Sequence, residues 1–235
     1  MRSPIFDTDH PPVRSEERFV LQNSRMLRVG LGPDVLATKG AMVGYVGQLQ
    51  FHHEKAGSLA KLGKKLLTGE NVSLMRVSGP GEVWFAQEAG YLYLLHLEND
   101  GISINSRNLL AMDAQLQWDI KMVKGAGLMT GGLFNTTVGG AGTLAVTVVG
   151  KPVVLDCSRQ PVYVDPNAAV CWSAGLVPSV QSSMNVKSML RGGSGEAVQY
   201  AFSGPGFVVV QSYEWRAPKS EGKGGVLDSV GDMFT

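Results

Sequence analysis

The sequence contains few of the residues on which disulfides, metal sites and charged surfaces depend. Its 235 residues include two cysteines and four histidines, and the net charge is +1. A charge so near zero creates no global field that would favour nucleic acid or a membrane. Cys157 and Cys171 both lie in apolar, strand-like runs, so two buried thiols in a reducing cytosol are favoured over a disulfide between them.

Long apolar runs are also missing. The longest fall well short of the ~20 residues that span a bilayer. The first residues, 1–7, contain no apolar core of signal-peptide length. We therefore expect a soluble, cytoplasmic protein.

Residue patterns typical of catalysis or metal binding are scarce. His52 and His53 are adjacent, and adjacent side chains on a strand point to opposite faces, so they would rarely bind one ion. We interpret them as part of a solvated turn before a helix. His96 lies in an apolar strand and is expected to be a hydrogen-bonded core residue. No metal or cofactor is expected.

Acidic and glycine-rich segments do not suggest catalysis either. Four aspartates are expected at strand ends, where carboxylates usually cap turns: Asp113, Asp119, Asp156 and Asp165. Gly79-Pro80-Gly81 and the segment 125–132 lack the lysine of a phosphate-binding loop. We assign no catalytic, cofactor or metal residues, and we expect that the protein is not an enzyme.

Glycine and β-forming residues are abundant, with 30 glycines and 11 prolines in the chain. A Gly-x-Gly motif precedes an apolar strand at three places, 79–81, 140–142 and 204–206. Glycine suits tight bends because it tolerates positive φ. The last glycines of the motifs stand about 60 residues apart, a period that implies repeated β-units.

The repeats predict a circularly closed fold. The first copy lacks a leading Gly-x-Gly strand, and the chain ends with an unattached one, so we expect 206–213 to pair with the unit begun by 19–51. Such closure would remove two exposed sheet edges. The expected divisions are an arm at 1–18, one body at 19–216 made of three pseudo-repeats (19–72 plus 203–216; 73–137; 138–202), and a polar tail at 217–235.

Each expected repeat carries an insert, and the first of these is basic. In 55–67, Leu59, Leu62 and Leu66 fall on one helical face, with four lysines mostly elsewhere. Lysines near an anionic membrane surface attract it, so this insert is the best candidate for peripheral membrane contact. The favoured interpretation is that the leucines cover the open end of a β-unit.

Several stretches resemble bacterial members of the altered-inheritance-of-mitochondria family. They are 21–29, 68–77, 94–98, 116–119 and 127–136. The resemblance implies a fold similar to the tryptophan RNA-binding attenuation protein, with small β-sandwich units repeated three times per chain. It also implies a link to mitochondrial inner-membrane organisation in the eukaryotic branch, and ring assembly in some members. It carries no catalytic residues over.

The expected function is a non-enzymatic binding or scaffolding module. Apolar strands at 91–97 and 144–149, with aromatic residues such as Trp84, Trp118 and Tyr93, are typical of interface cores and predict a cyclic homo-oligomer, a trimer in first place. The alternatives are a small-molecule or RNA binder with clefts between the repeats, or an enzyme. Nucleic acid is disfavoured because the charge is balanced and aromatics total 8%.

Overall fold

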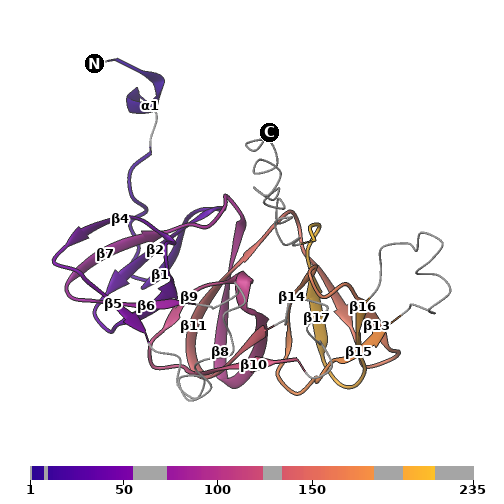
Figure 1. Ribbon diagram of the computed structural model, residues 1–235. Coiled ribbons are helices and arrows are strands. Elements are labelled where there is room, and N and C mark those ends of the chain that lie inside the picture. The colour runs from indigo at the N-terminus through magenta and orange to yellow at the C-terminus, as the bar shows by residue number, and fades with distance from the viewer. Residues whose placement is uncertain (1, 8–9, 55–72, 124–133, 183–197, 215–235) are drawn as a thin grey trace, which may run out of the picture.

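The computed structural model describes residues 2–7, 10–54, 73–123, 134–182 and 198–214 (Figure 1). A short helix, α1 (Pro4–Asp7), and a single 3-10 turn, η2 (Ser106–Asn108), accompany a body of strands in these residues. The strands are β1 (Phe19–Asn23), β2 (Met26–Leu31), β3 (Val35–Thr38), β4 (Met42–Gly47), β5 (Gln50–Glu54), β6 (Leu74–Ser78), β7 (Gly81–Phe85), β8 (Tyr91–Asn105), β9 (Leu109–Asp113), β10 (Gln117–Met122), β11 (Phe134–Val148), β12 (Val153–Asp156), β13 (Val162–Val164), β14 (Ala169–Ser173), β15 (Ser179–Ser182), β16 (Val198–Phe202) and β17 (Phe207–Val210). The predicted all-β class is confirmed.

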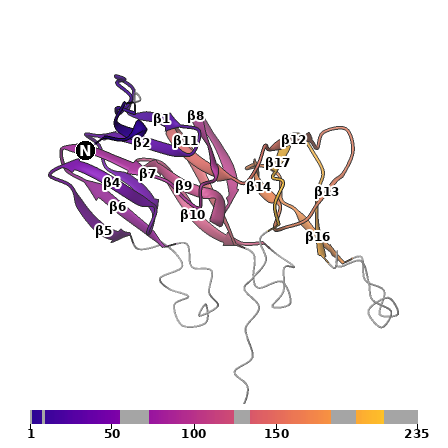
Figure 2. The same cartoon turned by 90° about the horizontal axis from the view of Figure 1, so that it is seen from above.

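The strands lie in three groups along the molecule: a first group of β1–β7, a second of β8–β11 and a third of β12–β17 (Figures 1 and 2). In the described residues they form three sheets, with the orders β1-β2-β7-β4, β12-β17-β14-β8-β11-β9-β3-β6-β5 and β13-β16-β15. Strand β10 also pairs with β11. The large sheet therefore runs through all three groups, while β4 and β13 end the two smaller sheets.

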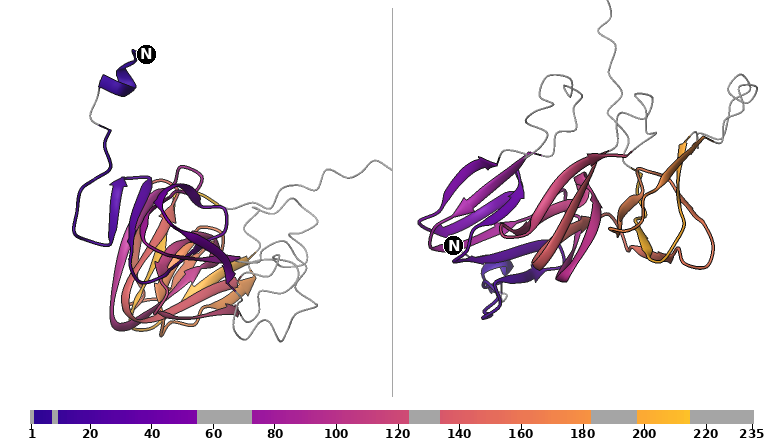
Figure 3. Two further views of the ribbon diagram at one scale, coloured as in Figure 1. Left: turned by 90° about the vertical axis from the view of Figure 1, so that its left-hand side faces the viewer. Right: turned by 90° about the horizontal axis from the view of Figure 1, so that it is seen from below.

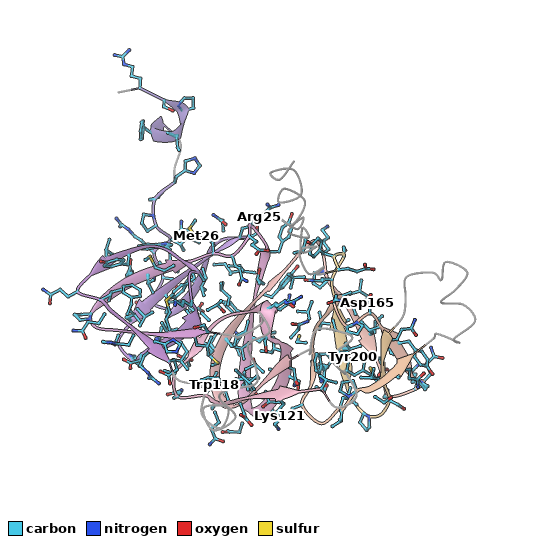
Figure 4. All side chains as sticks on the ribbon, viewed as in Figure 1. Arg25, Met26, Trp118, Lys121, Asp165 and Tyr200 are labelled. Atoms are coloured by element: carbon cyan, nitrogen blue, oxygen red, sulfur yellow. The ribbon has the colours of Figure 1, made fainter. Side chains whose placement is uncertain are left out.

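The buried core includes strands that have a paired strand along each edge, such as β9 between β11 and β3. Every residue of β9 is buried, and its mostly apolar sequence suits a strand that is covered on both faces. In the third group, Trp172, Tyr200 and Phe202 pack edge to face or tilted, with ring centres 5.5–6.4 Å apart. Tyr200 projects into the interior of this group (Figure 4).

The glycine motifs bend the chain as predicted. Both glycines of each motif have positive φ, from +102° at Gly79 to +158° at Gly142. A side chain at Gly81 would also collide with the backbone oxygen of Val46. Gly81 therefore must be glycine both for its left-handed conformation and for the close approach of β4, and positive φ favours glycine at the other motif positions.

The strand after each glycine motif pairs on both sides in a similar manner. Strand β7 lies between β2 and β4. The second half of β11 lies between β8 and β9, and β17 lies between β12 and β14.

The predicted pairing of 206–213 with the unit begun by 19–51 is therefore wrong. Strand β17 completes the third group of strands, because β12 and β14 occupy its two edges. In the first group that place belongs to β7, which directly follows Gly79-Pro80-Gly81. The glycine motif thus stands in the last third of a group rather than at its start. The circular closure is not formed, and the sheets stay open.

The residues Asn99-Asp100-Gly101 are typical of a hairpin turn, but they form none in the structure. Strand β8 continues through these residues and pairs with β11 along its whole length. The register shifts between Gly140 and Ala141, so Asn99, with φ +66°, is an extra residue on β8. Asparagine tolerates this conformation, and the signal that suggested a turn marks a β-bulge instead.

Two strand pairs join the three groups. Strand β3 pairs with β9, which joins the first group to the second. Strand β8 pairs with β14, which joins the second to the third. Strands β4 and β13 lie toward opposite ends of the row in Figures 1 and 2.

The polar N-terminal stretch at 10–18 is an extended arm and not a frayed end. Gln22 accepts a hydrogen bond from the Val13 amide and donates one to the Pro11 carbonyl, each at 3.0 Å. Arg28 donates to the carbonyls of Val13 and Ser15. The arm is thereby attached to β1 and β2.

The three predicted inserts and the polar tail lie mostly outside the described residues, which lack 55–72, 124–133, 183–197 and 215–235. The amphipathic helix expected at 59–66 falls in the first of these gaps. The described strand ends that flank the three inner gaps, on β5 and β6, β10 and β11, and β15 and β16, lie along one side of the molecule (Figure 3).

Candidate functional site

The adjacent histidines lie on a strand, so the prediction of a turn there is wrong. Both belong to β5, are exposed, and face Arg76 and Met75 of β6 in the register. Glu54 also belongs to β5, and its carboxylate accepts two hydrogen bonds from the Arg76 guanidinium of β6, at 2.9 and 3.0 Å. In the described residues, no three His, Cys, Asp or Glu side chains gather closely enough to hold a metal ion.

His96 is exposed, which contradicts its predicted place in the core. Its Nδ1 lies 3.1 Å from the Thr143 hydroxyl on the neighbouring strand β11. In the same apolar run, 91–97, Tyr93 is exposed as well. Tyr93 and His96 lie on opposite faces of β8, as do the buried Leu92 and Leu97, so each face of this half is partly core and partly surface.

The two cysteines are free and buried, as predicted. Burial raises the pKa of the Cys171 thiol to about 12. Burial also raises the pKa of Cys157, with a smaller contribution from the neighbouring Asp156 carboxylate. Both thiols are therefore protonated at neutral pH and are poor nucleophiles.

Two of the four aspartates cap turns, as predicted. Asp156 accepts hydrogen bonds from the backbone N–H and the hydroxyl of Ser158, which lower its pKa. Asp165 accepts from the Asn167 amide at 2.7 Å.

The other two aspartates differ from the prediction. Asp119 lies in the middle of β10 and not at a strand end. Asp113 ends β9, but it accepts a hydrogen bond from the Thr143 amide on β11 and forms an ion pair with Arg18. Arg18 also donates to the carbonyls of Pro33 and Asp34. Asp113 therefore connects the first two groups at the joint between them, the β3–β9 strand pair, and does not cap a local turn.

A buried polar network at the joint of the second and third groups was not predicted. Asn108 donates to the Thr147 carbonyl at 2.7 Å and to the Gln211 side-chain oxygen at 3.1 Å. The same oxygen of Gln211 accepts from the Val149 amide. Asn105 reaches the Ala169 carbonyl of β14 at 3.2 Å. Isolated polar residues in a sequence give no sign of such distant partners.

Shallow grooves occur on the described surface. One of about 350 Å³ lies between the arm and the sheet of β4, and it is lined by His10, Pro12, Gln22, Met26, Val43, Gly44 and Trp84. Another, of about 480 Å³, lies beside Gln211 and Tyr213. The first borders the outer strand β4.

Apolar edge strands are the most distinctive surface features of the described sheets, and they include β4, β13 and β12, on which Val153 and Val154 are exposed. On β4, Val43, Tyr45 and Val46 are exposed, and β4 pairs only with β7 among the described strands. On β13, Tyr163 is exposed, and β13 pairs only with β16 among them. An edge strand presents unpaired backbone groups that another chain can bind. We therefore take the edges of β4 and β13 as the candidate site.

Comparisons with known proteins agree with this architecture. The family model described as mitochondrial biogenesis AIM24 matches residues 19–213. The chain belongs to this AIM24 family. An uncharacterised protein of Streptococcus pyogenes serotype M6 is 25% identical over 194 residues, which cover 77% of each chain. A crystal structure of a Streptococcus pyogenes protein covers 83% of this chain and 92% of its own, at 22% identity and a TM-score of 0.65.

Membership of the AIM24 family confirms the resemblance found in the sequence. The similarity to the crystal structure supports the fold alone, because an identity of 22% is too low to carry over a function. No helix in the described part of the chain is long and apolar enough to cross a membrane.

Proposed function

We propose that this AIM24 family protein is a self-associating, non-enzymatic scaffold or binding module that acts in the cytoplasm. We further propose that it is built from three β-repeats and assembles into a ring, with a trimer as the expected size. The observation that carries the proposal is the exposed apolar row Val43, Tyr45 and Val46 on the outer strand β4. An unprotected apolar edge is a template for pairing with another chain.

The repeat proposal rests on how the strands pair. In each group, the strand after the glycine motif lies between two antiparallel partners: β7 between β2 and β4, β11 between β8 and β9, and β17 between β12 and β14. The strand before the glycine motif also has two partners each time: β6 has β3 and β5, β11 has β8 and β10, and β16 has β13 and β15.

The scaffold proposal rests on the contrast between these groups. Strands β9 and β14 are almost wholly buried, whereas β4 is mostly exposed. Natural proteins usually blunt edges with charge or proline, and β4 (Met42-Val43-Gly44-Tyr45-Val46-Gly47) contains neither. Such an edge is better explained by a partner than by contact with water.

Light scattering after size-exclusion chromatography tests the proposal. One chain has a mass of 25.1 kDa. We expect a mass several times larger at micromolar concentration, and we expect Tyr45→Lys to lower it because edge charges oppose pairing. A mass that stays at one chain over a wide concentration range would refute self-association.

The membrane contact proposed for the basic insert 55–67 is tested separately, because this segment lies outside the described residues. Sedimentation with anionic vesicles should retain the protein, and replacing Lys55, Lys61, Lys64 and Lys65 with glutamine should release it. Equal sedimentation of both proteins, or none of either, would remove the membrane from the proposal.

A further inference from the structure

The two joints between the groups have one common register. Strand β3 lies on β9 with the pairs Val35–Asp113, Leu36–Met112 and Ala37–Ala111. Strand β8 lies on β14 with the pairs Ile102–Ser173, Ser103–Trp172 and Ile104–Cys171. Both joints are antiparallel. Whether the two registers match can be decided from the glycine motifs, which give each group a fixed reference point.

Strands β3, β8 and β13 each pair with the strand that precedes a glycine motif, and three of their residues have equivalent positions relative to that motif. Val35, Ile102 and Val162 each pair with the residue two before the first glycine of the motif, which is Val77, Val138 or Phe202. The next residue along is Leu36 on β3, Ser103 on β8 and Tyr163 on β13. Tyr163 therefore holds the place of Leu36 and Ser103.

Strands β4, β9 and β14 each pair with the strand that follows a glycine motif, and three of their residues also have equivalent positions relative to that motif. Tyr45, Met112 and Trp172 each pair with the residue two after the second glycine, which is Val83, Leu144 or Val208. In the first joint Leu36 faces Met112, and in the second Ser103 faces Trp172. The two joints thus use the same register.

The outer strand β4 has the same local shape as the strands used in the joints. The pairing register skips one residue at the same place in all three: Val43 on β4, Leu110 on β9 and Val170 on β14. Such bulges bend a strand and fix which residues face a neighbour. Strand β4 is therefore shaped like β9 and β14, but no described strand lies on its outer edge.

We infer that β13 of one copy pairs with β4 of a second copy as an antiparallel strand, with Tyr163 facing Tyr45, Val162 facing Val46 and Val164 facing Gly44. This inference rests on the proposed self-association and specifies its interface. The occupant of each edge is a second copy of this chain, because the chain already forms this joint twice with its own strands.

The exposed side chains fit this arrangement. Tyr45 is 48% exposed and Tyr163 is 53% exposed, and facing aromatic side chains on neighbouring strands attract one another. No atom lies within 4 Å of the place that a side chain at Gly44 would fill, so the face of β4 is open there, and no described strand pairs with its outer edge.

The two edges are different surfaces, so the contact is head to tail. A head-to-tail contact repeats from copy to copy and gives a ring where the rotation closes and a filament where it does not. The inference therefore agrees with a ring and excludes a dimer in which two β4 edges face each other.

Disulfide trapping between two single variants tests the register. Tyr45→Cys and Tyr163→Cys are prepared separately, mixed and oxidised. The mixture should give a covalent dimer, twice the 25.1 kDa of one chain, and each variant alone should give none. The native thiols, Cys157 and Cys171, are buried and should not react.

Val177→Cys provides the matched control for Tyr163→Cys. Val177 belongs to the same group of strands and is 81% exposed, but it lies outside β13. Mixed with Tyr45→Cys, it should give no dimer. A dimer from this mixture, or from Tyr45→Cys alone, would overturn the register.

A charge exchange separates the register from the proposed function. Tyr45→Lys should reduce the wild-type mass in light scattering, and adding Tyr163→Glu to the same chain should restore it. If the wild-type protein associates but neither trapping nor restoration occurs, the register is wrong and the proposed function stands. If the wild-type mass is that of one chain, both are wrong. Circular dichroism of each variant checks that the fold is kept.

Discussion

Tyr45 on β4 and Trp172 on β14 occupy matching places and have different surroundings. Each faces a valine of the strand that follows a glycine motif, Val83 for Tyr45 and Val208 for Trp172. Yet Tyr45 is 48% exposed and Trp172 is 2% exposed. The difference comes from the next neighbour, since β8 covers the outer edge of β14 and no described strand covers β4. Burial is set here by topology and not by residue type.

The largest expected effect follows from the buried member of this pair. Trp172→Ala removes a core side chain that contacts Tyr200 and Phe202, and it should lower the free energy of unfolding by about 3–5 kcal/mol. Tyr45→Ala should lower it by less than about 1 kcal/mol at concentrations where the protein is a monomer. Urea denaturation followed by circular dichroism measures both. Equal losses would show that the two places do not differ as described.

A second pair compares two glycines at the β4 edge. Gly81 has φ +151°, and a side chain there would strike the Val46 carbonyl, so Gly81→Ala should cost about 1–3 kcal/mol from the strained conformation alone. Gly44 has open space around it, and Ala111 holds the matching place on β9. Gly44→Ala should therefore change the unfolding free energy by no more than about 0.5 kcal/mol. Urea denaturation measures the unfolding free energy of both variants. A large loss of stability in Gly44→Ala would contradict the equivalence of Gly44 and Ala111.

A third comparison concerns alkaline pH. Burial raises the pKa of Cys171 to about 12, so the folded state keeps this proton while the unfolded chain loses it above its ordinary pKa of about 8.5. Stability should therefore be unaffected by this group below pH ~8.5 and fall between that pH and ~12, by at most about 1.4 kcal/mol per pH unit.

The control for this effect is Cys171→Ala, since alanine stands at the matching place on β9. The variant should lose part of the alkaline slope, and the remainder would belong to groups such as Cys157 and Tyr200, whose pKa values are also raised by burial. Unfolding free energies measured between pH 8 and 10 report the slope. An unchanged slope in the variant would mean that Cys171 is not the group responsible.

The sequence predicts the strands and the glycine turns better than their partners. The strands at β4, β9 and β14 and the positive φ of Gly79 and Gly81 follow from local residue types. The pairing of 206–213 was mispredicted because a sequence period of about 60 residues gives the length of a unit and not its starting point. Only the hydrogen bonds of β17 with β12 and β14 decide where a group ends.

The candidate site could not be located from the sequence for a related reason. Strand β4 is as apolar as the buried strand β9, so local patterns cannot show which of them lacks a neighbour. His96 illustrates the same limit, since it lies in a run of apolar residues but faces the surface. An exposed edge is a property of the sheet order and not of the strand that forms it.

Hydrogen exchange at two protein concentrations tests most directly whether the edges of β4 and β13 join separate copies. We expect the amides of 42–47 and 162–164 to gain protection together as the concentration rises, because both strands acquire backbone partners in the same contact. The amides of β9 and β14 should stay equally protected at both concentrations, since their neighbours belong to the same chain. Exchange at 42–47 and 162–164 that is independent of concentration would contradict the account.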